Sequence, residues 1–220
     1  MRRRGRPRSA NVLGRENAAL VWDNSGYCRG AAVAADLYQP LIEQDINSPM
    51  RIAIVGNSGS GKSTLAQQLV NAHHLVALDL DTVAWEPGQI AVAREPQLAV
   101  AEVRHFCAST PHWVVEGCYA GLIREALRYA TLLLFLEPGA DVCRANCHDR
   151  PWEPHKFKSA QEQDRHFEFL LQWVDAYYSR SGDASLREHQ AVFDAFGGQK
   201  HKLAQRASPR FVEQLELQPS

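Results

Sequence analysis

Beginning at Met50, short apolar runs alternate with longer segments whose apolar residues recur at helical spacing. The runs predict strands at residues 51–55, 75–80, 113–116, 132–136 and, more briefly, 200–204. A run that is apolar throughout, such as 132–136, is typical of a strand covered on both faces of its sheet. The alternation therefore predicts an α/β fold, in which helical crossovers join parallel strands.

The segments between these runs carry helix signals. Helices are predicted at 61–73, from Glu95 to Phe106, at 122–129, at 140–148, from Ser159 onward and from Ser208 onward. Pro96 and Pro209 suit the first turn of a helix, where no intrahelical N–H bond is lost. Ser159 with Glu162 forms a capping box, and the apolar spacing after it predicts an amphipathic helix of four or five turns.

One segment carries a phosphate-binding pattern. Gly56-Asn57-Ser58-Gly59-Ser60-Gly61-Lys62-Ser63-Thr64 fits G-x-x-x-x-G-K-[ST], and it follows a predicted strand and opens a predicted helix. Its glycines allow successive backbone N–H groups to surround phosphate oxygens at a positive helix terminus. We expect all of residues 56–64 to bind ATP, with Lys62 on the β- and γ-phosphates, Ser63 ligating Mg²⁺ and Thr64 near the α-phosphate.

A second acidic element, Leu78-Asp79-Leu80-Asp81-Thr82, ends the run at 75–80. Residues two apart in a strand share a face, so Asp79 and Asp81 are expected to project together, one toward the metal and the other toward an acceptor hydroxyl. The alternative is a pair of solvated acids in a turn. The sequence lacks the N-K-x-D element of GTPases, and Glu137, which ends the run at 132–136, stands before a proline without an adjacent aspartate. The pattern favours a phosphotransferase.

These residues resemble the adenylate kinase-like and shikimate kinase-like branch of P-loop proteins, and most closely the topology modulation proteins. The resemblance rests on residues 51–64, 78–81, 85–88 and 114–117. It implies a five-stranded parallel sheet of order 2-3-1-4-5, ATP with Mg²⁺ as phosphoryl donor, and a lid whose arginines close over the phosphates. It also implies that Asp79 assists Mg²⁺ and that Asp81 contacts the acceptor. The paired arginines by which adenylate kinases hold AMP are not evident, so the acceptor stays open.

The basic segment 144–158 follows the fourth strand, where this branch places its lid. We expect Arg150 to act on the γ-phosphate and Arg144 to contribute to nucleotide binding. A solvated basic loop is the alternative. Cys143 and Cys147 lie four residues apart and offer two ligands from one helix, which favours helix packing over a zinc site.

The composition of the chain limits the classes of partner that are expected. The net charge is −1, but residues 1–49 hold seven arginines against five acidic residues, which leaves residues 50–220 mildly acidic. No apolar stretch approaches the roughly 18 residues of a membrane span, so no membrane partner is predicted. The five cysteines have no framework spacing, which predicts reduced thiols and a cytoplasmic protein.

The sequence divides into an irregular extension, 1–49, and a kinase-like domain, 50–220. Arg2-Arg3-Arg4-Gly5-Arg6-Pro7-Arg8 resembles an AT-hook core, but one copy is weak support for DNA binding. The favoured function is an ATP-dependent kinase whose partner is a small phosphoryl acceptor, such as a nucleoside, a nucleotide or a hydroxylated metabolite. The alternative is a nucleotide-responsive, DNA-associated regulator with slow ATPase activity.

Overall fold

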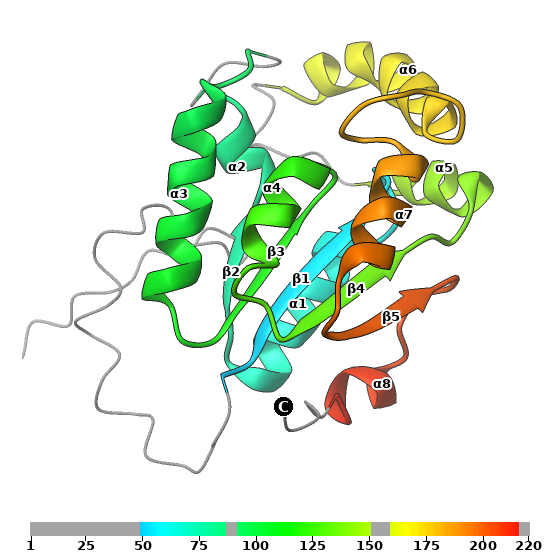
Figure 1. Cartoon of the computed structure of the whole chain (residues 1–220). Helices are drawn as coiled ribbons and strands as arrows, with labels where there is room; N and C mark the ends of the chain where they lie inside the picture. Colours follow the sequence, from blue (N-terminus) through cyan, green and yellow to red (C-terminus); the bar gives the residue numbers. More distant parts are fainter. Residues whose placement is uncertain (1–48, 87–91, 151–158, 216–220) are drawn as a thin grey trace, which may run out of the picture.

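The computed structural model describes residues 49–86, 92–150 and 159–215. Its centre is a five-stranded parallel sheet of order β2-β3-β1-β4-β5 (Figure 1). The strands are β1 (Arg51–Gly56), β2 (Val76–Asp79), β3 (Trp113–Gly117), β4 (Leu132–Leu136) and β5 (Gln199–Leu203). Both the α/β class and the expected strand order are confirmed.

Eight helices are described around this sheet. They are α1 (Lys62–His73), α2 (Asp81–Ala84), α3 (Pro96–Ser109), α4 (Ala120–Ala126), α5 (Ala140–His148), α6 (Ala160–Ala176), α7 (Leu186–Ala195) and α8 (Pro209–Glu213). Helices α3, α4 and α7 pack on one face, while α1 and α8 cover the other. Helices α5 and α6 pack on each other beyond the carboxyl end of β4 (Figure 1).

Strand β1 explains why the core has two halves. Ile52 and Ile54 belong to the apolar cluster beneath α1, whereas Ala53 and Val55 belong to the cluster beneath α3, α4 and α7. All four side chains are fully buried. Alternate residues of a strand point to opposite faces, so an all-apolar run is required when helices cover both.

The predicted helix starts are confirmed by their caps. Ser159 Oγ accepts a hydrogen bond from the Glu162 N–H (3.1 Å), and Ser208 Oγ accepts one from the Phe211 N–H (3.1 Å). Helix α7 was not predicted, although its sequence carries the same signal. Ser185 Oγ accepts from the Glu188 N–H (3.3 Å), which makes Ser185 its N-cap.

Some predictions lie outside the described residues. They concern the arginine-rich segment at 2–8 and the later part of the proposed lid, including Lys156 and Lys158. In the described part of the chain, no helix is both long enough and apolar enough to cross a membrane.

Candidate functional site

The phosphate-binding loop connects β1 to α1, as the motif predicts. Gly59 and Gly61 have φ values of +74° and +93°, which L side chains rarely adopt. Lys62 opens α1, and its Nζ donates to the Asn57 carbonyl oxygen at 2.9 Å. This side chain is only 8% exposed, and its ammonium is folded back onto the loop.

The loop is fastened to α5 and α6. Asn57 Nδ2 donates to the Val174 carbonyl oxygen (2.9 Å), and Asn146 Nδ2 donates to the Gly59 carbonyl oxygen (2.8 Å). The contact at Gly59 is tight, because a Cβ built there would lie 2.2 Å from the Cys143 carbonyl oxygen. Two helices that flank the proposed lid therefore hold the phosphate loop directly.

A carboxylate missed by the sequence analysis stands beside the predicted metal ligand. Ser63 Oγ donates to Glu116 Oε1 at 2.7 Å, and Glu116 is 2% exposed. Glu116 lies in β3, paired with Ile54 of β1 and with Asp79 of β2, whose exposure is 9%. The available signal was an acid at the end of the apolar run that begins at Trp113.

The donor atoms near Ser63 suit magnesium. A hydroxyl with two carboxylates from neighbouring strands presents hard oxygen ligands, which Mg²⁺ prefers and combines with water and phosphate oxygens. Ser63, Glu116 and Asp79 are the described residues that could hold it. Across the described ranges, no group of three or more His, Cys, Asp or Glu side chains is arranged to bind a metal. Cys143 and Cys147 are buried against Val174.

The structure corrects the expectation that Asp79 and Asp81 share a strand face. Strand β2 ends at Asp79, Leu80 takes a helical conformation (φ −66°, ψ −17°), and Asp81 begins α2. Asp79 Oδ1 accepts the Asp81 N–H at 2.9 Å, and such a local bond competes with strand extension. Burial of Leu80 against Gly117 fixes the turn.

Asp81 instead belongs to a chain of side-chain hydrogen bonds. Tyr119 Oη donates to Asp81 Oδ1 (2.7 Å) and accepts from Trp85 Nε1 (2.8 Å). Burial, followed by the charge of Asp81, raises the pKa of Tyr119 well above its ordinary value of 10.0. The phenol therefore stays protonated and donates to Asp81 at every pH at which the protein would be studied.

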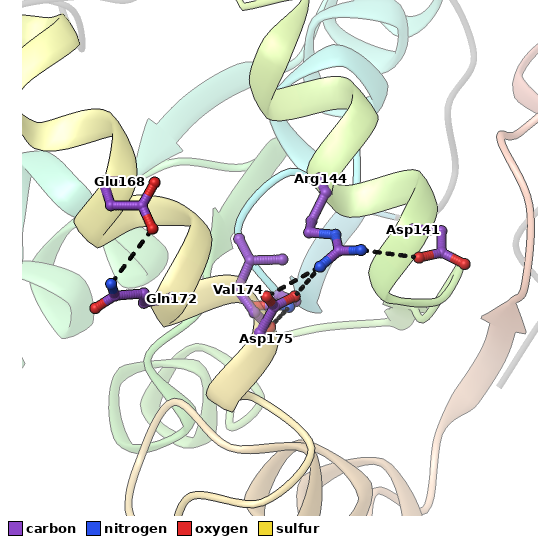
Figure 2. Close-up of polar contacts among 7 residues, drawn as sticks. Asp141, Arg144, Glu168, Gln172, Val174 and Asp175 are labelled. Atoms are coloured by element: carbon purple, nitrogen blue, oxygen red, sulfur yellow. Dashed lines mark hydrogen bonds and ion pairs between the residues drawn. The ribbon is translucent and has the colours of Figure 1, made fainter.

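The two lid arginines lie in and just after α5. Arg144 Nη1 contacts Asp175 of α6 (3.1 Å to Oδ2), and its Nη2 contacts Asp141 (3.4 Å), as Figure 2 shows. The contact with Asp175 ties α5 to α6, whereas the contact with Asp141 lies within α5. Arg150 follows the end of α5 by two residues, and its backbone N–H donates to the Cys147 carbonyl oxygen. The ligand roles of both arginines remain predictions.

Four charged side chains act on one thiol at the end of β3. The pKa of Cys118 is raised to about 12, chiefly by burial; the charges of Asp81 and Glu116 act in the same direction, and those of Lys62 and Arg180 oppose them. Cys118 is therefore a neutral thiol. Arg180, which no motif marked, therefore acts electrostatically on the same thiol as Lys62 and Asp81.

One family profile matches part of this chain. The profile of the NB-ARC domain, a P-loop NTPase domain, matches residues 32–104, about a third of the chain. No curated protein matches the sequence.

Solved structures of small-molecule kinases are similar at low identity. A gluconokinase from Sinorhizobium meliloti shares 17% identity at a TM-score of 0.44, covering 75% of this chain and 87% of its own. A sugar kinase from Janibacter sp. shares 16% (TM-score 0.40; 75% and 91% covered). Shikimate kinase from Acinetobacter baumannii, in complex with shikimate, shares 14% (TM-score 0.41; 77% and 89% covered). At these values the likenesses carry no inference about the substrate. The fold rests on the sheet order and the phosphate-binding loop.

Proposed function

We propose that this chain, a P-loop NTPase by its sheet order and its phosphate-binding loop, is an ATP-dependent phosphotransferase acting on a small molecule. The observation that carries the proposal is a division of labour between two carboxylates. Glu116 accepts a hydrogen bond from the hydroxyl of Ser63, the predicted metal ligand, while Asp81 accepts one from Tyr119. Separate acidic groups for metal and acceptor are what phosphoryl transfer to a hydroxyl requires.

The residues divide the work as follows. Backbone N–H groups of residues 56–64 and the Lys62 ammonium bind the triphosphate and neutralise charge on the transferring group. Ser63, Glu116 and Asp79 would hold Mg²⁺, which supplies further charge neutralisation when bound. Arg150 is proposed to add positive charge at the γ-phosphate.

Asp81 serves as the base. The acceptor oxygen forms a bond to the γ-phosphorus as the bond from that phosphorus to the β,γ-bridging oxygen breaks. The acceptor proton passes to Asp81, and the bridging oxygen leaves on ADP. Catalysis then depends on positioning and charge, because no covalent intermediate with the protein is involved.

The test is ADP release by the full chain with ATP and Mg²⁺ against nucleosides, nucleoside monophosphates, sugars and hydroxy acids. We expect acceptor-dependent ADP release that Lys62→Ala abolishes with the fold retained. Lys202→Ala is the matched control, because Lys202 lies in β5 and contacts Glu137 rather than the phosphate loop. Turnover by Lys62→Ala equal to that of the wild type would contradict the proposal. ADP release that no acceptor stimulates would favour a simple ATPase, the activity of the regulator alternative.

A further inference from the structure

Arg180 lies between α6 and α7, and its guanidinium is fixed on three sides. Its Nε donates to the Ala184 carbonyl oxygen (2.7 Å), and its Nη1 donates to the Trp173 carbonyl oxygen (2.8 Å). The guanidinium carbon lies 3.6 Å from the centroid of the Trp173 ring. The remaining nitrogen, Nη2, is buried and finds no hydrogen-bond partner in the part of the chain that the structure describes.

The charge of Arg180 also has no counter-ion among the described residues. Several other arginines contact carboxylates, among them Arg94 with Glu102 and Arg124 with Glu188. Within the described ranges, no carboxylate lies within ion-pair distance of Arg180. A partly desolvated charge with an unsatisfied donor is costly, and proteins usually pair such groups. The guanidinium fork is a geometry suited to a carboxylate or a phosphate.

The segment that carries Arg180 is held against the acceptor side of the site. The Asp183 carbonyl oxygen accepts from the Ala120 N–H (3.2 Å), and Asp183 Oδ1 accepts from the Gly121 N–H (2.7 Å). His189 Nε2 lies 2.9 Å from the Cys118 carbonyl oxygen. These contacts hold the segment that follows Arg180 against residues 118–121, and the charge of Arg180 acts on the same Cys118 thiol as those of Lys62 and Asp81.

We propose that the phosphoryl acceptor carries an oxyanion, either a carboxylate or a phosphate, and that Arg180 binds it through Nη2. The inference rests on the proposed function in one respect, namely that the bound anion belongs to a phosphoryl acceptor. The anion site itself can be tested by binding alone. It makes Arg180 a determinant of specificity. Anionic acceptors would be accepted, while neutral analogues would leave the buried Nη2 without a partner.

The experiment uses matched pairs of compounds and the full chain with Mg²⁺ and a non-hydrolysable ATP analogue. Comparison of gluconate with sorbitol tests recognition of a carboxylate, and comparison of AMP with adenosine tests recognition of a phosphate. Calorimetry measures binding, and ADP release with ATP measures transfer. We expect one anion at least to bind about 10- to 100-fold more tightly than its neutral partner, the range of a hydrogen bond to a charged group.

Variants assign the effect to the residue. Arg180→Gln should weaken binding of that anion about 10- to 100-fold while the affinity for the ATP analogue stays unchanged, and Arg180→Lys should retain an intermediate affinity. Arg187→Gln is the control, since Arg187 is exposed on α7. If Arg180→Gln does not fold, Arg180→Lys and the preference of the wild type between paired compounds still decide.

The outcomes separate the two proposals. Equal binding of both members of each pair, binding of neither anion, or unchanged anion affinity in a folded Arg180→Gln protein would overturn the anion site. Anion binding that depends on Arg180 without any phosphoryl transfer would support the anion site and refute the kinase.

Discussion

Ser63 and Glu116 lie 53 positions apart in the chain, and a hydrogen bond of 2.7 Å joins Ser63 Oγ to Glu116 Oε1. Both groups stand at the carboxyl edge of the sheet, one after β1 and one in β3. This edge is where parallel α/β proteins bind ligands. The pair therefore identifies which acid of the sheet faces the predicted magnesium position.

Glu116→Gln should weaken the apparent Mg²⁺ affinity and lower turnover about 10- to 100-fold, the usual effect of altering a group that orients a metal ligand. The substitution keeps the volume and removes the charge. Measurement of ADP release against Mg²⁺ concentration checks it. Glu137→Gln is the control, because Glu137 follows the equally apolar strand β4 but contacts Lys202 and Tyr178. Equal effects of the two substitutions would contradict the assignment.

The sequence was sufficient for features that depend on neighbours in the chain. The loop at 56–64, the alternation of strands and helices, and the caps at Ser159 and Ser208 are local patterns. The strand order of the sheet was predicted from a family resemblance, which the phosphate-binding loop indicated. It holds because a right-handed crossover from each parallel strand leaves few arrangements.

The features that the sequence did not predict depend on contacts between residues that are far apart in the chain. Glu116 and Glu137 both follow apolar runs, and only the contact with Ser63 distinguishes them. The same-face argument for Asp79 and Asp81 was wrong because Leu80 turns the chain into α2. Tyr119 meets Asp81 from 38 positions away, a relationship that no spacing rule predicts.

Tyr119→Phe should reduce kcat/KM for the acceptor about 10-fold or more without changing ATP affinity, because it removes a hydrogen bond to a charged group. Tyr119 holds Asp81 and is itself a positioning residue, so Asp81→Asn should have the larger effect. Steady-state kinetics with the acceptor varied at saturating ATP measure it. Tyr129→Phe is the matched control for loss of a phenol near α4, because Tyr129 packs against the apolar cluster beneath α3, α4 and α7. A Tyr119→Phe enzyme with wild-type kinetics would show that Asp81 needs no such support.

Gly59→Ala should destabilise the fold and weaken ATP binding. A non-glycine residue held at φ +74° costs about 1–3 kcal/mol, and the new Cβ would meet the Cys143 carbonyl oxygen at 2.2 Å. Urea unfolding and calorimetry with ATP and Mg²⁺ measure the two effects. Gly197→Ala is the control, because nothing lies within 4 Å of its Cβ position. A Gly59→Ala protein as stable as Gly197→Ala would show that the loop and α5 separate easily.

His189 of α7 is fully buried and contacts the residues that follow α6 and β3. One ring nitrogen lies 2.8 Å from Tyr177 Oη and the other 2.9 Å from the Cys118 carbonyl oxygen. Because the carbonyl oxygen can only accept, Nε2 carries the proton, and Nδ1 accepts from the phenol. The neutral ring satisfies both partners, whereas a charged ring would turn Nδ1 into a donor and force the Tyr177 hydroxyl to accept instead of donate.

Burial lowers the pKa of His189 from 6.5 to about 4, and the charges of Lys62, Arg180 and Arg124 act in the same direction. Between pH 4 and pH 6.5, the unfolded chain therefore binds a proton at His189 that the folded protein does not bind. Stability from the neutral ring is complete above pH 6.5, and it falls as the pH drops toward 4, by about 3 kcal/mol in all. Urea unfolding at intervals of pH should show a shallower decline for His189→Gln, even though that variant is less stable at neutral pH. His105→Gln, a change at an exposed position on α3, should keep the wild-type slope. Parallel declines for His189→Gln and the wild type would mean that His189 takes up its proton in the folded protein at its ordinary pKa.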